Sequence, residues 1–162
     1  MVFSLLKFRK PDVPRLVRVY FSEVRLIVAP MHQASTGVYY EQLEPIVIEV
    51  PVGPAEVGAA FREAFDRFSV SNHNVPGTKK SDWPAFQASG VRSMKAFERQ
   101  YLPVLCEGLN RSNAVVRASV AHPTEAGMEV SACFNPLLAE EEIGTLLLRV
   151  ASAAGGHARG VE

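Results

Sequence analysis

Two segments of this 162-residue chain share a pattern that restricts its fold, since each places short strands before a helix that opens with Glu-(Val/Ile)-Gly. Counted from Gly58 and from Gly144, apolar residues recur at matching positions: one before, then three, six, seven and ten after. This spacing puts them on one face of a helix. The match favours an internal strand-strand-helix pseudo-repeat, although two unrelated amphipathic helices would also produce it. We expect each glycine to let its helix lie close against a sheet.

The strand pattern predicts the partner of these helices. Short β-branched or alternating runs occupy residues 16–21, 24–29, 38–42, 46–50, 102–109, 114–122 and 128–134. The last two runs alternate apolar and polar residues, as antiparallel strands do when one face meets water. Such a sheet needs cover on its other face, which the helices expected near 54–68 and 138–153 supply. We therefore predict an α+β domain with a mainly antiparallel sheet of about six or seven strands and the helices packed on it.

A central block, residues 79–101, separates the two halves and carries the only tryptophan, Trp83. Pro84 can begin a short helix that ends at Gly90, and Ser93 can cap a second one. Residues 30–37 and 69–81 are expected to be loops. We predict a single domain over residues 1–162, with a basic N-terminal arm at 1–15 and a frayed tail at 155–162.

Composition argues against several classes of function. Seventeen basic and seventeen acidic residues cancel, so the chain lacks the basic field of a nucleic-acid binder. The sequence has no run of about 18 apolar residues, so it predicts no membrane span. The first ten residues do not match a signal peptide, because their charges follow the apolar run. We expect a cytoplasmic protein that binds neither nucleic acid nor membrane.

Residues capable of catalysis are present but not arranged in a recognised motif. Cys106 and Cys133 could act as nucleophiles with a histidine base, yet neither lies at a predicted helix N-terminus or in a catalytic signature. The four histidines are scattered singly, which argues against a metal site. The triplet of glutamates at 140–142 is explained by its place in a first helical turn. We expect no catalytic residues, no metal and no cofactor.

The central block resembles a known family. The segment SDWPAFQASGVRSMKAFERQY, residues 81–101, is similar to the central signature of immunity proteins from bacterial contact-dependent growth inhibition (CDI) systems. GVYYEQLEPIVIEVP with the following EVG, residues 37–58, and EEEIGTLLLRV, residues 140–150, fit the same family. The resemblance covers roughly residues 24–150. These motifs are structural, built on aromatic and glycine positions.

The resemblance implies a stoichiometric inhibitor. Such a protein stays in the cytoplasm of the producing cell and binds the C-terminal toxin domain, often a nuclease, of the delivered effector. The family supplies no catalytic residues, and its toxin contacts vary with the toxin. Two other classes stay open: a small thiol-dependent hydrolase using Cys106 or Cys133, and a structural subunit that self-associates through a sheet edge or aromatic loop.

Charge predicts where a nuclease toxin would bind. Nucleases present basic clefts, and an inhibitor gains association rate from the opposite sign together with aromatic anchors. Acidic residues concentrate between positions 41 and 66, and side-chain alternation puts Tyr39 and Glu41 on one strand face. We predict a toxin-binding surface formed by Tyr39, Glu41, Glu44, Asp82 and Trp83. The alternative is an ordinary solvated edge with buried tyrosines.

Overall fold

The computed structural model describes residues 13–71, 82–120 and 127–155. Its elements, in chain order, are β1 (Arg15–Phe21), β2 (Arg25–Gln33), β3 (Tyr39–Glu41), β4 (Ile46–Glu49), α1 (Pro54–Asp66), β5 (Ser69–Val70), α2 (Pro84–Ser89), α3 (Met94–Gln100), β6 (Leu102–Asn110), β7 (Asn113–Ser119), β8 (Glu129–Phe134) and α4 (Glu140–Ala153). Most of the predicted basic arm and tail lies outside the described residues.

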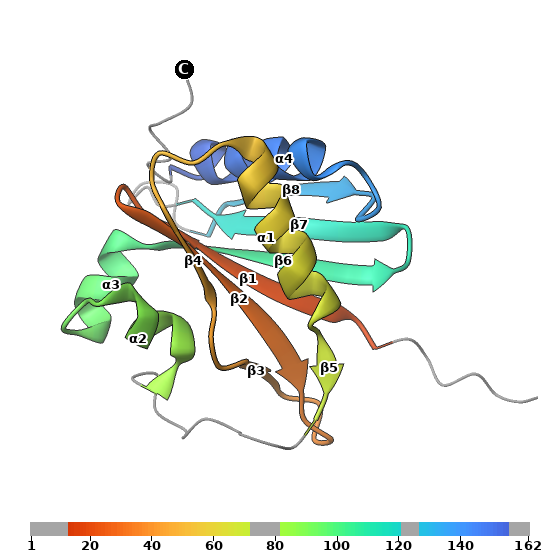
Figure 1. Ribbon diagram of the computed structural model, residues 1–162, viewed down its shortest axis with the longest axis horizontal. Coiled ribbons are helices and arrows are strands. Elements are labelled where there is room, and N and C mark those ends of the chain that lie inside the picture. Colours follow the sequence, from red (N-terminus) through yellow and green to blue (C-terminus); the bar gives the residue numbers. More distant parts are fainter. Residues whose placement is uncertain (1–12, 72–81, 121–126, 156–162) are drawn as a thin grey trace, which may run out of the picture.

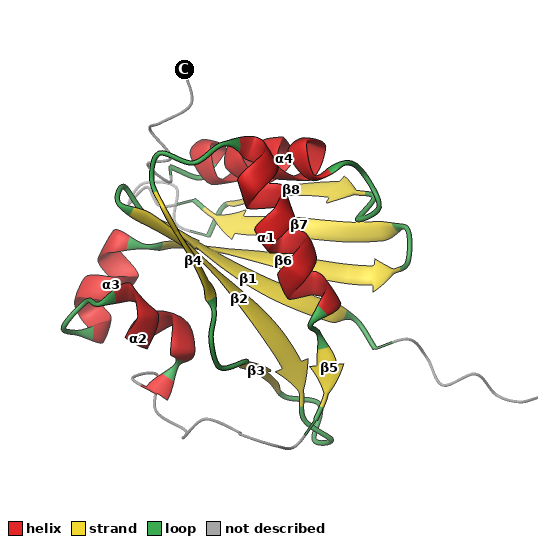
Figure 2. Ribbon diagram, viewed as in Figure 1, coloured by secondary structure: helices red, strands yellow, loops and turns green. Residues whose placement is uncertain are grey.

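The strands form one eight-stranded sheet with the order β3-β2-β1-β6-β7-β8, while β4 and β5 also pair with β2. All the pairings are antiparallel except that of β5, which runs parallel to β2. The four helices pack against this sheet (Figures 1 and 2). The predicted α+β class is confirmed, with more strands than the six or seven expected.

Each face of the sheet has its own hydrophobic cluster. α1 and α4 lie over one face of the sheet (Figure 1). There Phe61, Leu147 and the inward side chains of β1, β6 and β7 form the larger core. The smaller cluster lies beneath α2 and α3 and contains Tyr20, Ile27 and Phe97. On β7 and β8 the side chains toward α4 are buried or half-buried, and the alternating ones are half-buried or exposed. The predicted wet face is therefore present.

The glycines of the shared helix pattern lie at the contact between α1 and α4, two helices that cross in Figure 1. A Cβ placed on Gly58 would lie 1.7 Å from the carbonyl oxygen of Glu140. One placed on Gly144 would lie 1.8 Å from the carbonyl oxygen of Pro54. The expectation that these glycines bring each helix close to the sheet is wrong, because what they permit is backbone contact between the two helices. The pseudo-repeat itself stays a prediction.

Two predicted loops contain strand. β2 continues to Gln33, past Pro30, where the sequence pattern predicted a loop. Pro30 lies where β2 changes partners, from β4 to β3 on one edge and from β1 to β5 on the other. A proline is tolerated at such a break in a ladder, and its carbonyl still accepts from the Gln42 N–H at 2.7 Å. The start of the predicted loop 69–81 forms β5, and residues 72–81 lie outside the described residues.

None of the helices in the described parts of the chain is both long and apolar enough to cross a membrane.

Replacing Gly58 or Gly144 by alanine should destabilise the fold. The added methyl group meets backbone atoms, which cannot move aside unless the helices separate, so we expect a loss of about 2–4 kcal/mol in unfolding free energy for each variant. Gly53→Ala is the matched control, since no atom lies within 4 Å of its built Cβ. Its cost, which comes from the weaker N-cap, should be below about 1 kcal/mol. Urea unfolding measures all three, and equal effects would contradict the crossing argument.

Candidate functional site

The central block docks on the sheet through aromatic rings. Phe97 of α3 lies 5.1 Å from the ring centroid of Tyr20 on β1, and it also contacts Tyr101 at 4.8 Å and Phe86 at 5.6 Å. Arg25 of β2 adds polar contacts by donating to the carbonyl oxygens of Ala88 and Ser89 at the end of α2, at 3.3 and 3.5 Å. The block therefore forms a ledge on the face opposite α1 and α4.

A buried carboxylate joins this ledge to the sheet. Glu41 of β3 is only 4% exposed, and its Oε1 accepts from the Tyr20 hydroxyl at 2.5 Å. Its Oε2 accepts from the Ala85 N–H in the first turn of α2 at 2.9 Å. Burial raises the pKa of Tyr20, and the nearby Glu41 charge raises it further, so Tyr20 stays a donor. Strands β1 and β3 and the start of α2 thus meet at one side chain.

Of the five residues of the predicted toxin-binding surface, only Glu44 is exposed. Glu41 was predicted as part of this surface but is buried. Alternation gave its side of the strand and not what covers it. Tyr39 is half-buried, donates its hydroxyl to the Pro14 carbonyl at 3.0 Å and lies 6.2 Å from the Phe68 ring. Glu44 is exposed, and its carbonyl accepts from Arg67 near the end of α1. Asp82 and Trp83 are half-buried beside α2. Whether any of them contacts a partner stays a prediction.

Trp83 lines a groove of about 390 Å³ where the ledge meets the uncovered strands. We call it the α3 groove. Its wall consists of Trp83, Met94, Phe97, Glu98 and Tyr101, and its floor includes Arg18, Tyr20, Leu105, Arg117 and Glu129. Arg18, Leu105, Arg117 and Ser131 are successive partners in register across β1, β6, β7 and β8, so their side chains share one face.

Arg18 is the residue of this groove that sequence analysis missed. Its guanidinium lies 5.4 Å from the centroid of the Trp83 ring, an arrangement that favours cation–π attraction. Nη1 also donates a long hydrogen bond, 3.5 Å, to the Tyr20 hydroxyl. The sequence pattern that could have pointed to it is the alternation in β1, which puts the side chains of Arg18 and Tyr20 on one face of the strand. No feature of the neighbouring sequence connects either residue to Trp83.

A second, larger groove of about 770 Å³ lies at the C-terminal end of α1. Four of the exposed large hydrophobic side chains line it: Val13, Val70, Leu109 and Leu137. Gly108 also lines this groove. A larger residue would not fit there, since a Cβ would lie 2.5 Å from the ring of Phe65. We call this groove the α1-end groove.

Catalytic and metal-binding groups do not converge in the described parts of the chain. Cys106 is fully buried between β1 and β7, and burial raises the pKa of its thiol, which disfavours the reactive thiolate. Cys133 is exposed on β8. Among residues 13–71, 82–120 and 127–155, no group of three or more potential metal ligands occurs.

Comparison with known proteins supports the fold. No protein-family model and no curated protein sequence matches the chain. Among solved structures, a protein of unknown function from Neisseria meningitidis, NMB0488, is similar with a TM-score of 0.64 and 16% identity, over 96% of this chain and 100% of that one. A chain of the CdiA-CT/CdiI toxin and immunity complex from Yersinia pseudotuberculosis is similar with a TM-score of 0.61 and 11% identity, over 87% and 97% of the two chains. At these identities the likeness establishes a shared fold.

Glu41→Ala should destabilise the chain by about 3 kcal/mol, because it leaves the Tyr20 hydroxyl and the Ala85 N–H buried without an acceptor. Glu44→Ala is the matched control. Glu44 is exposed, and the substitution should change the unfolding free energy by less than about 0.5 kcal/mol. Chemical denaturation followed by circular dichroism measures both variants. Similar values for the two would mean that Glu41 does not hold the ledge.

His32 should make stability depend on pH. It is 5% exposed, its Nε2 has no hydrogen-bond partner within the described residues, and burial lowers its pKa. As pH falls below about 6.5, His32 becomes protonated in the unfolded chain but stays neutral in the folded chain, where its pKa is lower. The unfolding free energy should therefore fall. In His32→Leu this contribution should be absent. Urea unfolding at intervals between pH 7.5 and 5.5 measures it, and identical slopes in both proteins would contradict the assignment.

Proposed function

We propose that this chain is an immunity protein that binds and neutralises the C-terminal toxin domain of a CDI effector. The observation that carries the proposal is the fold shared with a chain of the CdiA-CT/CdiI toxin and immunity complex, which extends over nearly the whole of both chains. The central-block resemblance adds to it, since that block builds the wall of the α3 groove. Inhibition would be stoichiometric and would take place in the cytoplasm.

The site supports such a role physically. An inhibitor needs a preformed surface with aromatic anchors partly open to solvent, because a few buried aromatic and arginine side chains carry most of the energy of an interface. The α3 groove offers Trp83, Arg18 and Met94, all half-buried, beside strands whose outward side chains are half-buried or exposed. Its rigid base, a sheet covered by two crossing helices, keeps the ordering cost of binding low.

On this proposal, the gene immediately upstream encodes a large exoprotein that ends in a toxin domain. The purified chain and that domain should form a 1:1 complex, measured by size-exclusion chromatography with light scattering. Expression of the chain should protect cells that produce the toxin domain. A well-folded chain that neither binds the domain nor protects the cells would refute the proposal.

Two variants separate this function from a thiol-dependent hydrolase. Cys133→Ser and Cys106→Ala should protect cells as the parent does, since neither sulfur is expected to take part in chemistry. The buried Cys106 variant should lose on the order of 1 kcal/mol of stability. Loss of protection by either variant while it remains folded would favour the hydrolase. A mass that rises with concentration, without any toxin partner, would favour a self-associating subunit.

A further inference from the structure

We propose that Arg18 is a preformed receptor for a carboxylate, and that the α3 groove takes a segment of the toxin domain in which an apolar side chain stands beside an aspartate or glutamate. The inference rests on the proposed function and adds the chemistry of the contact. It differs from the acidic surface predicted from the sequence, because the group that would bind the toxin domain is a cation, Arg18, and not a carboxylate.

The first observation is how Arg18 is held. Its guanidinium lies on the Trp83 ring, and one nitrogen donates to the Tyr20 hydroxyl. These contacts fix the plane of the group on a half-buried stem. Arginine has five N–H donors, and the hydrogen bond to Tyr20 uses one of them. A fixed guanidinium with free donors binds a carboxylate through two parallel hydrogen bonds at little cost in side-chain entropy.

The second observation is that Arg18 has no carboxylate within ion-pair distance in the described parts of the chain. Arg15, Arg25, Arg62, Arg67 and Arg117 each have one within 4 Å. The carboxylate connected to it through hydrogen bonds is Glu41, on the far side of the Tyr20 hydroxyl. Both Glu41 oxygens already accept hydrogen bonds, from Tyr20 and from the Ala85 N–H. Glu41 is therefore connected to Arg18 only through the Tyr20 hydroxyl. It does not pair directly with the guanidinium, whose remaining N–H donors are left for a partner in the groove.

The third observation is the charge pattern along the floor. Arg117 stands in the same row as Arg18, on the other side of Leu105, but its guanidinium lies 3.4 Å from Glu107. Glu98 on the wall and Glu129 on β8 line the groove as well. The groove thus changes sign along its length, so a carboxylate fits over the arginine row and not beside Glu98 or Glu129. Leu105, between the arginines, offers apolar contact to the neighbouring side chain of the partner.

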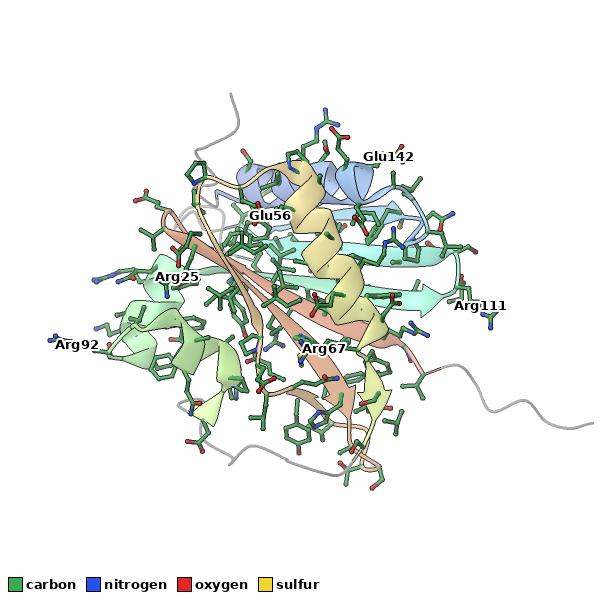
Figure 3. The ribbon with its side chains drawn as sticks, viewed as in Figure 1. Arg25, Glu56, Arg67, Arg92, Arg111 and Glu142 are labelled. Carbon is green, nitrogen blue, oxygen red and sulfur yellow. The ribbon has the colours of Figure 1, made fainter. Side chains whose placement is uncertain are left out.

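Matched variants test the proposal against the toxin domain encoded beside this chain. Arg18→Met and Arg117→Met each remove one charge from the same row, and only the first removes a guanidinium without an acidic partner. Isothermal titration should show that Arg18→Met raises Kd by about tenfold or more. Arg117→Met should raise it by no more than about threefold, since its charge is already paired with Glu107. Arg92, which points away from the ledge in Figure 3, supplies a distant control, Arg92→Met.

Three results would overturn the inference: Arg18→Met binding within threefold of the parent, Arg117→Met losing as much as Arg18→Met, or Arg92→Met doing so. If Arg18→Met does not fold, Arg18→Lys decides by the same thresholds. It keeps the charge but loses the planar fork, so it should also bind at least about tenfold more weakly. Failure of the parent chain to bind the toxin domain would instead refute the proposed function, which keeps the two failures distinct.

A double-mutant cycle then locates the partner group. Each aspartate and glutamate of the toxin domain is replaced in turn by its amide and measured against the parent chain and against Arg18→Met. One acidic residue should lose its effect on Kd when Arg18 is already absent, which is the mark of a direct pair. Additive effects at every acidic residue of the toxin domain would contradict the proposal.

Discussion

The architecture depends on backbone contact between two helices. Because Gly58 and Gly144 carry no side chain, the first turns of α1 and α4 meet at the distance of their carbonyl groups, and both helices fit over one face of a single sheet. A larger residue at either position would push the helices apart and open the core around Phe61. With that face covered, the opposite face is left for the central block and, on the proposed function, for a partner. The division into a face covered by α1 and α4 and a face that carries the central block follows from these two positions.

The face that carries the central block is organised by polar groups as well as by packing. Glu41 connects β3, β1 and α2, and through the Tyr20 hydroxyl it stands behind Arg18 at the floor of the α3 groove. Because its two oxygens accept hydrogen bonds from β1 and from the first turn of α2, Glu41 fixes where the ledge stands on the sheet. Arg25 contributes at the other end of α2, and Figure 3 shows it between the sheet and the ledge. The groove is thus a consequence of how the central block is anchored.

The sequence predicted most helices and strands correctly, but it did not predict which distant residues their side chains contact. Alternation in β7 and β8, the proline at the start of α1 and the glycine after α2 are local signals, and the elements they predicted are present. What covers a given side chain is set by residues far away in the chain, so alternation could not show that Glu41 is buried by α2. For the same reason the spacing of Gly58 and Gly144 predicted close packing but assigned it to the sheet. Arg18 and Trp83 are 65 positions apart in the chain, so no local sequence pattern could predict their contact. Alternation showed only that Arg18 and Tyr20 share one face of β1.

The claim that a toxin domain occupies the α3 groove is tested most directly at Trp83, the only tryptophan of the chain. Incorporation of 5-fluorotryptophan into this chain alone gives a single ¹⁹F resonance that reports the groove, even when the unlabelled toxin domain contains tryptophans of its own. Addition of that domain should shift this resonance until it saturates at one equivalent, because the partner changes the surroundings of the ring. A complex that forms at 1:1 while the resonance stays at its original position would place the interface elsewhere, with the α1-end groove as the next surface to examine.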